Sequence, residues 1–325
     1  MRTATALAHP NIAFIKYWGN RNEALRLPSN SSLSMNLAGL ETRTQVDFDE
    51  AFHRDELILN GAEQEGAALV RVSAFLDLVR SMGGIKAGAR VESTNNFPSG
   101  AGVASSASAF AALALAASRA AGLDLDEAAL SRLARRGSGS ASRSVPGGFV
   151  EWRAADKDED SFAYSVAPAG HWDLVDCIAV VSEAHKSTGS TQGHALAGTS
   201  PLQGARVAGA EARLGACREA LLDRDFAALA EVAELDSHLM HAVMMTSNPR
   251  LLYWQPGTMA VLLAVADWRE EGLQACTTID AGPNVHVICT EEDSRELAAR
   301  LAKVEGVQAV IEAPVGGPTR VLEAA

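Results

Sequence analysis

Short apolar stretches separated by turn residues fill the first sixty positions, and this pattern predicts strands. Residues 42–48 alternate between polar and apolar side chains with the period of two that a half-exposed strand requires. Residues 57–59 precede Asn60-Gly61, as one arm of a hairpin would. Along the whole chain, strands are predicted at 4–8, 12–18, 33–37, 42–48, 57–59, 89–93, 175–182, 275–280, 285–290 and 307–312.

Helical spacing of apolar residues alternates with these strands. Residues 125–136 carry acidic side chains in their first turn and arginines in their last, which complements the helix dipole at both ends. Residues 104–121 have the length of a membrane span, but alanine is only weakly apolar and the stretch contains serines and Arg119, so a buried helix is predicted. The predicted helices are 67–82, 104–121, 125–136, 202–222, 226–246, 257–271 and 295–304.

This order of elements predicts an α+β protein of two lobes. The chain has 325 residues, of which 47% are hydrophobic and 21% charged, and this is enough apolar material for two cores. We place the division near residue 185, giving an N-terminal lobe of residues 1–185 and a C-terminal lobe of residues 186–325. The charge run at 156–160 is interpreted as a solvated hairpin tip. His238 and His241, which lack an H-E-x-x-H pattern, are interpreted as core or interface residues.

The net charge of −12 argues against a nucleic acid or an anionic membrane as a partner. A phosphate ligand would then need local cations and oriented amides. The first ten residues lack the long apolar segment of a signal peptide. The cysteines are far apart and form no C-x-x-C pair, so we expect reduced thiols in a cytoplasmic protein; they are Cys177, Cys217, Cys276 and Cys289.

A glycine-rich loop before the alanine-rich helix predicts a phosphate site. Residues 98–108 (Pro-Ser-Gly-Ala-Gly-Val-Ala-Ser-Ser-Ala-Ser) direct free amides and the positive end of a helix dipole at one place. The loop is neither a Walker loop nor a G-x-G-x-x-G motif, and the structural alternative is a simple turn before a core helix. The candidate ligand-binding residues are Pro98, Gly100, Gly102, Ser105, Ser106 and Ser108.

Lys16 lies in the apolar segment Asn11-Ile-Ala-Phe-Ile-Lys-Tyr-Trp-Gly19. A buried lysine is unfavourable unless it meets an anion. The alternative is that its side chain extends to the edge of the sheet. Lys16 is therefore a candidate for an anion-binding or catalytic site.

A second cation, Arg143, ends the serine-rich stretch Gly137-Ser-Gly-Ser-Ala-Ser-Arg143. Its guanidinium can bind a carboxylate or phosphate in bidentate fashion, while Ser138 and Ser140 donate alongside it. Because plain surface loops seldom have this composition between apolar elements, we favour a ligand pocket.

Asp280 ends a predicted strand before the turn Ala281-Gly-Pro-Asn284. A carboxylate in that place can act as a catalytic base or a metal ligand, and the alternative is an Asx turn that caps the backbone. The polar loop 186–193 can close over a ligand, although loops of serine, threonine and glycine are common.

Together these segments resemble the GHMP superfamily of small-molecule kinases, and within it the mevalonate diphosphate decarboxylase family. The resemblance covers nearly the whole chain. It implies a GHMP-kinase-type fold with an N-terminal lobe like ribosomal protein S5, a C-terminal ferredoxin-like lobe, an active site between them and a homodimer. The segments that carry it are 11–19 (NIAFIKYWG), 28–34 (PSNSSLS), 96–106 (NFPSGAGVASS), 137–143 (GSGSASR), 147–152 (GGFVEW), 190–193 (STQG) and 280–284 (DAGPN).

The resemblance also implies an ATP- and Mg²⁺-dependent decarboxylation of a mevalonate phosphate. Asp280 resembles the acid that orients or deprotonates the C3 hydroxyl, and Lys16 resembles a lysine near the reacting centre. Arg143 and Asn11 are similar to the groups that hold the substrate carboxylate. Tyr17, Asn20, Ser138, Ser140 and Ser190 are assigned to the substrate, Asn96 and Lys186 join the loop serines and glycines at ATP, and Ser106 is assigned to the metal.

One position departs from the family pattern. The family motif continues Lys-Tyr-Trp-Gly-Lys, and that second lysine contacts the terminal phosphate of a diphosphate, whereas this chain has Asn20. Loss of such a charge-assisted contact costs about 1.5–3 kcal/mol. The change favours a 5-monophosphate substrate and isopentenyl phosphate as product. Arg21, the next residue, is a possible replacement, although an extended segment directs it to the opposite face.

Two other functions stay open. A GHMP kinase that phosphorylates C3 and stops would share the ATP loop, and release of CO₂ distinguishes it. A non-catalytic ATP-binding protein would need no acid at Asp280, and production of ADP distinguishes that. A diphosphomevalonate decarboxylase that makes isopentenyl diphosphate is the alternative within the family.

Overall fold

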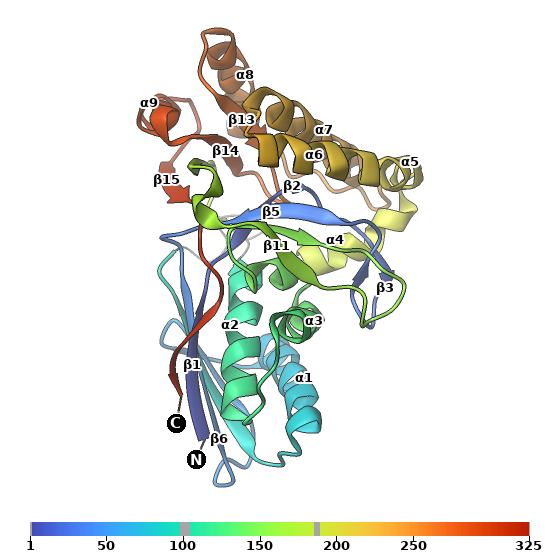
Figure 1. The fold of residues 1–325 in the computed structure, drawn as a ribbon, viewed down its shortest axis with the longest axis vertical. Helices are drawn as coiled ribbons and strands as arrows, with labels where there is room; N and C mark the ends of the chain where they lie inside the picture. Colours follow the sequence, from blue (N-terminus) through green and yellow to red (C-terminus); the bar gives the residue numbers. More distant parts are fainter. Residues whose placement is uncertain (1, 98–104, 185–188, 325) are drawn as a thin grey trace.

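The alternating segments near the N-terminus form strands of two different sheets. The computed structural model describes residues 2–97, 105–184 and 189–324 (Figure 1). Its strands are β1 (Arg2–Ala8), β2 (Asn11–Ile15), β3 (Asn20–Asn22), β4 (Leu27–Pro28), β5 (Ser32–Asn36), β6 (Thr42–Asp49), β7 (Glu56–Leu59), β8 (Ala62–Gln64), β9 (Gly88–Asn95), β10 (Phe149–Trp152), β11 (Ala163–Ala167), β12 (Leu174–Val180), β13 (Ala275–Thr278), β14 (Val285–Thr290), β15 (Ala309–Pro314) and β16 (Arg320–Ala324).

Helices cover one face of the first sheet and both sides of the later strands, so the predicted α+β class is confirmed. The helices are α1 (Gly66–Gly83), α2 (Ser105–Ala120), α3 (Glu127–Gly137), α4 (Ser190–Leu196), α5 (Gln203–Ala208), α6 (Ala210–Asp223), α7 (Phe226–Thr246), α8 (Pro256–Glu270) and α9 (Glu291–Leu301), with short 3₁₀ turns at Gly139–Ser144, Ala169–His171 and Ala197–Thr199.

Three larger sheets build the described part of the chain. The first has the order β16-β1-β6-β9-β7-β8, and α2 packs along β1 and β6 (Figure 1). The second, β11-β10-β5-β2, lies beneath α6 and α7, which contact β2. The third, β13-β14-β12-β15, is covered by α8 and α9. The second sheet therefore lies between the other two, and residues 16–20 leave it at the end of β2.

Strands from one side of the predicted division at residue 185 pair with strands from the other side. β12 precedes that residue in the chain, yet it pairs with β14 and β15. β16 follows it by more than a hundred residues, yet it pairs with β1. The division into residues 1–185 and 186–325 stays a prediction, and these two strands show how closely the halves are interleaved.

Most predicted elements differ from the structure by one or two residues at an end, and three differ by more. The strand expected at 12–18 ends at Ile15, because the backbone N–H of Lys16 donates to Asp236 instead of to a neighbouring strand. The helix expected at 202–222 breaks at Gly209, where a Cβ would lie 2.7 Å from a guanidinium nitrogen of Arg213. The last helix begins at Glu291, four residues early, because acidic side chains fill its first turn.

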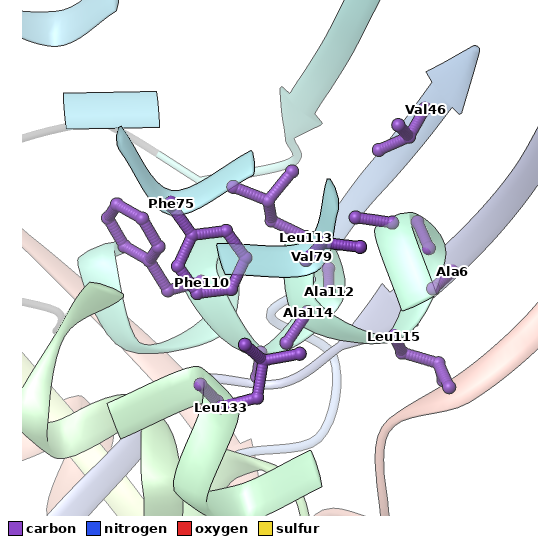
Figure 2. Packing of buried hydrophobic residues seen from close by; sticks show 14 of the residues in the cluster. Ala6, Val46, Phe75, Val79, Phe110, Ala112, Leu113, Ala114, Leu115 and Leu133 are labelled. Atoms are coloured by element: carbon purple, nitrogen blue, oxygen red, sulfur yellow. The ribbon is translucent and has the colours of Figure 1, made fainter. Parts of the chain in front are cut away.

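The alanine-rich segment predicted to be a buried helix is α2. Its side chains pack between the first sheet and the helices α1 and α3 (Figure 2). Small alanines bring the helix close to β1 and β6, and Phe75 and Phe110 fill the space beside it with ring centroids 5.5 Å apart. No helix of the described residues is long and apolar enough to span a membrane.

A close approach at the end of α3 gives a stability test. A Cβ at Gly137 would lie 2.0 Å from the ring of Phe110, and that ring is held between Phe75 and the guanidinium of Arg71. Gly137→Ala should lower the free energy of unfolding by about 1–3 kcal/mol through overpacking. Gly215→Ala, in the open middle of α6, is the matched control and should be neutral or stabilising. Equal destabilisation of both variants in urea unfolding would contradict this account.

Candidate active site

A buried ion pair joins the end of β2 to the loop after β13. The ammonium of Lys16 lies 2.7 Å from a carboxylate oxygen of Asp280, and the lysine side chain is 1% exposed against 30% for the aspartate. Burial lowers the pKa of Lys16, and the nearby Asp280 carboxylate opposes that shift. Lys16 thus meets an anion, as its burial requires, and the half-buried carboxylate faces a cavity.

The backbone around Lys16 is held by a charged network in the interior. Asp236 of α7 accepts a hydrogen bond from the Lys16 N–H at 2.7 Å, and it also binds Arg213 at 2.7 Å and Arg206 at 3.5 Å. Arg206 donates in turn to the carbonyl of Lys16 at 2.7 Å. Because both backbone groups of Lys16 are fixed from the second lobe, its ammonium has a defined direction.

Arg143 is 4% exposed and is surrounded by neutral acceptors. Its guanidinium donates to Ser32 at 2.7 Å, to Ser34 at 3.1 Å and to the side-chain oxygen of Asn11. Burial lowers the pKa of Arg143 to about 10, and the charge of Asp280 opposes the shift. A buried guanidinium without a hydrogen-bonded carboxylate is a strong site for an anionic ligand. Asn11 positions that guanidinium.

A row of hydroxyls connects two cavities. Ser138 lies 3.2 Å from Ser106 and 3.4 Å from Ser140, measured between hydroxyl oxygens. Ser138 and Ser140 line a cavity of about 100 Å³. The other residues that line it include Lys16, Arg143, Asp280, Tyr17 and Ser190. Ser106 lines both this cavity and a neighbouring one of about 280 Å³ beside α2.

The second cavity has apolar walls and polar groups at the α2 end. Arg71 and Asn95 line it with Ser105 and Ser106, next to the helix N-terminus. Arg71 donates to the carbonyl of Gly137 at 2.7 Å, and burial lowers its pKa to about 10. Its buried Nε has no hydrogen-bond partner in the described part of the chain. This donor and the first-turn amides of α2 suit a phosphate-containing ligand.

Tyr17 lines the first cavity, whereas Asn20, which was predicted to bind substrate, bonds to Tyr17 but is not among the residues that line the cavity. The Tyr17 hydroxyl donates to the side-chain oxygen of Asn20, and the Asn20 amide donates to Glu23 at 2.8 Å. Burial raises the pKa of Tyr17, so it remains a hydroxyl. Arg21 is directed away, because its guanidinium binds Asp156 and the carbonyls of two neighbouring residues.

His194 of α4 was missed by the sequence reasoning. Its ring stacks on Tyr17 at a centroid distance of 4.1 Å and lies tilted against Trp18 at 4.5 Å, and its Nδ1 accepts a hydrogen bond from the Gly19 N–H. Burial lowers its pKa to about 3, so the ring is neutral and its proton is on Nε2. It lines the cavity beside Ser190. His194 is four residues after Ser190, so on a helix it lies on the same face as that predicted substrate residue, and this spacing was a signal that the sequence offered.

Two other residues were also missed. Arg26 lines the first cavity and Arg71 the second. Arg26 separates two leucines in a short apolar run, which is the kind of interruption that identified Lys16. Arg71 lies on a predicted amphipathic helix, where an arginine is ordinary, so the sequence offered no signal there.

The remaining predicted residues differ in their positions. Ser108 is fully buried, with its hydroxyl bonded to Thr42 at 2.6 Å, so it faces the core instead of a cavity. Asn96 is exposed and binds the backbone of residues 39–41, while its neighbour Asn95 lines the second cavity. The predicted ATP-binding residues Pro98, Gly100, Gly102 and Lys186 lie outside the described residues.

His238 and His241 lie in different environments. His241 is buried, with its ring against Trp254 and its Nε2 3.3 Å from the carbonyl of Ile279. His238 lines an outer groove between α7 and α8. No group of three or more His, Cys, Asp or Glu side chains in the described ranges is arranged to hold a metal ion.

The fold and this paired-cavity site are those of a two-lobed GHMP-type enzyme, and comparison with known proteins gives the family. Residues 8–163 match the diphosphomevalonate decarboxylase-like N-terminal domain, and residues 177–320 match the mevalonate 5-diphosphate decarboxylase C-terminal domain. The chain therefore belongs to the diphosphomevalonate decarboxylase family.

Relatives and solved structures agree with this assignment. The chain is 39% identical to the diphosphomevalonate decarboxylase of Aspergillus fumigatus, over 93% of this chain and 80% of that protein. It is 38% identical to the phosphomevalonate decarboxylase of Haloferax volcanii, over 98% of both. A crystal structure of the Staphylococcus aureus mevalonate diphosphate decarboxylase superposes with a TM-score of 0.94 at 36% identity, covering 99% and 98% of the two chains. A complex of MDDEF with MVAPP, AMPPCP and magnesium gives 0.93 at 38%, covering 99% of both.

The buried His241 predicts a pH dependence of stability. Burial lowers its pKa in the folded protein to about 4, against about 6.5 in an unfolded chain. Between these values the unfolded state binds a proton that the folded state excludes, so stability should fall as the pH falls from 6.5 to 4. His241→Gln should reduce that slope, by up to about 1.4 kcal/mol per pH unit, in urea unfolding. The exposed His53→Gln is the control, and an unchanged slope in His241→Gln would contradict the prediction.

Proposed function

We propose that this protein catalyses the ATP-dependent decarboxylation of 5-phosphomevalonate, giving isopentenyl phosphate, ADP, phosphate and CO₂ in isoprenoid biosynthesis. The observation that carries the proposal is the convergence of Lys16, Asp280 and Arg143 on one cavity that meets a second cavity at Ser106. The first cavity offers both an acid and a buried cation for a hydroxy acid. The second offers phosphate donors for a nucleotide.

The second cavity fits ATP by its donor chemistry. Its apolar walls suit a nucleoside. The Nε of Arg71, which has no hydrogen-bond partner among the described residues, and the α2 N-terminus suit phosphates. Mg²⁺ bound to those phosphates would supply charge neutralisation, and the exposed hydroxyl of Ser106, which lines both cavities, is a protein oxygen that could hold it. The assignments of Pro98, Gly100, Gly102, Lys186 and Ser106 to ATP or metal remain part of this proposal.

In the first cavity, Asp280 orients the C3 hydroxyl of the substrate and accepts its proton as the γ-phosphoryl group transfers to that oxygen. The adjacent Lys16 ammonium stabilises the carboxylate and the developing negative charge. Arg143 binds the substrate carboxylate. The C3–O bond then breaks with loss of phosphate, the C1–C2 bond breaks with loss of CO₂, and the electron pair of that bond forms the C2=C3 alkene. The residues act by positioning and electrostatics.

The monophosphate is favoured by the groups that are bonded to Tyr17 beside the cavity. Asn20 is neutral, its oxygen is occupied by the Tyr17 hydroxyl, and its amide holds the carboxylate of Glu23 at 2.8 Å. A second phosphate would approach that negative charge without a lysine to offset it. Production of isopentenyl diphosphate from the 5-diphosphate is the alternative, and phosphorylation of C3 without decarboxylation is the second.

We propose a cytoplasmic protein, supported by cysteines that are all unpaired within the described residues. We propose a homodimer, supported by the family resemblance and by exposed apolar side chains on neighbouring helices, among them Leu235 of α7 and Met259 and Leu263 of α8.

The acid gives a direct test of the chemistry. Asp280→Asn should fold normally and bind ATP, but lose about 10²–10⁴-fold in turnover because the proton acceptor is removed. ADP and CO₂ release by purified enzyme measure the loss. Asp160→Asn, an exposed carboxylate at the hairpin tip, is the control and should retain full activity. Near-normal turnover by a folded Asp280→Asn enzyme would reduce Asp280 to a turn cap.

Substrate choice is tested by comparing four acids: mevalonate, its 5-phosphate, its 5-diphosphate and its 3-phosphate. The wild type should have its highest kcat/KM with the 5-phosphate and release CO₂ as well as ADP. Asn20→Lys should shift the ratio toward the 5-diphosphate by roughly ten- to a hundredfold, if about 1.5–3 kcal/mol is recovered. Better use of the diphosphate by the wild type would leave the diphosphomevalonate decarboxylase reaction in place of the one proposed.

A further inference from the structure

A hairpin beside the first cavity carries a cation that the reaction proposed above leaves unused. β3 and β4 pair from Asn20 to Pro28, and Arg26 ends the turn between them. Its backbone is in the left-handed region, with φ of 51°, which is rare for a residue with a long side chain. Its side chain lines the cavity together with Tyr17, Ser138 and Ser140.

The guanidinium of Arg26 is hydrogen-bonded through its Nε, and its two terminal nitrogens can donate to a ligand. Its Nε donates to the carbonyl of Arg136 at 3.1 Å. In residues 2–97, 105–184 and 189–324, neither of its terminal nitrogens has a hydrogen-bond acceptor, and no carboxylate lies within ion-pair distance. By contrast Arg21, five residues earlier, is paired with Asp156. A half-buried guanidinium with an anchored Nε and two available donors is arranged to bind an anion.

Arg26 lies beside the serine turn that lines the cavity, because its Nε bonds to the carbonyl of Arg136, two residues before Ser138. Tyr17 lies against the same turn, since a Cβ at Gly139 would be 2.6 Å from its hydroxyl. The charge of Arg26 lowers the pKa of Tyr17, against the larger effect of burial, and adds to the effect of burial in lowering that of His194. The charge of Arg143 acts on Lys16 as well as on Tyr17 and His194, and the other charges that act on Lys16 are those of Asp280 and Asp236. Tyr17, Ser138 and Ser140 line the same cavity as Arg26 and bring hydroxyl groups to it.

We propose that Arg26 is the residue that binds the 5-phosphate of the substrate, in place of the lysine that Asn20 replaces. This inference rests on the proposed function. Arg143 then holds the carboxylate and Arg26 the phosphate, so that a substrate with an anion at each end can bind in only one direction. One guanidinium fork matches one phosphate group, and the remaining donors around it are neutral hydroxyls.

The test compares phosphorylated and unphosphorylated substrate. Arg26→Gln should raise KM for 5-phosphomevalonate by about ten- to a hundredfold, because a charge-assisted contact is lost. The affinity for ATP should be unchanged, and calorimetric binding of unphosphorylated mevalonate should change less than twofold. Arg26→Asn, which tolerates the left-handed backbone better, serves as a second variant if Arg26→Gln unfolds. Arg21→Gln is the matched control, since it removes a neighbouring arginine that is directed away from the cavity.

The outcomes separate the two proposals. Wild-type turnover together with unchanged KM in folded Arg26→Gln and Arg26→Asn would overturn the role of Arg26 and leave the proposed function intact. An equal loss of affinity for mevalonate and its 5-phosphate would also overturn that role, because it would show a general effect on the cavity. A wild-type enzyme that releases neither ADP nor CO₂ with any of the four acids would overturn both proposals.

Discussion

The carboxylate of Asp236 is the interaction on which the site geometry depends. It lies in α7 with no exposure to solvent, and it binds two arginines of the second lobe and the backbone of Lys16 in the first. A buried charge of this kind is stabilised only when all its partners are in place, and loss of one partner is strongly unfavourable. The network therefore fixes the end of β2 relative to the helices. The direction of the Lys16 side chain, and the path of the chain on to Tyr17, therefore depend on this network.

The local electrostatics of the cavity run against those of the whole molecule. The chain carries a net charge of −12, yet Lys16, Arg143 and Arg26 meet around one small cavity with Asp280 as the carboxylate within it. At physiological ionic strength the distant surface charges are screened over about 8 Å, whereas the buried cations are not. The attraction of an anionic substrate to the cations of the cavity is thus stronger than its repulsion by the distant surface charges. Because the hydrogen-bond partners of Arg143 within the described ranges are neutral, its charge can act on a ligand.

The sequence predicted what depends on local chemistry and missed what depends on the meeting of distant segments. The alanine-rich helix, the α+β class and the family were predicted, because periodicity and contiguous motifs carry them. The end of β2 at Ile15 was not, since Asp236, more than two hundred residues away, captures the next N–H. Ser108 was assigned to a ligand from its place in the motif, but helical geometry directs it toward Thr42. There was little indication of His194 and Arg71 in the sequence, because each is placed at a cavity by contacts with segments that are distant in the chain.

The pairing of β16 with β1 has a consequence for how the polypeptide matures. The first sheet acquires its other strands within the first ninety-five residues, whereas β16 is made only from Arg320 onward. During synthesis at roughly 5–20 residues per second, β1 therefore spends ten seconds or more with an open edge. Unpaired edges invite pairing with other chains. A ribosome-bound chain has to keep that edge protected until β16 emerges, so one late strand completes a sheet whose other strands are made more than two hundred residues earlier.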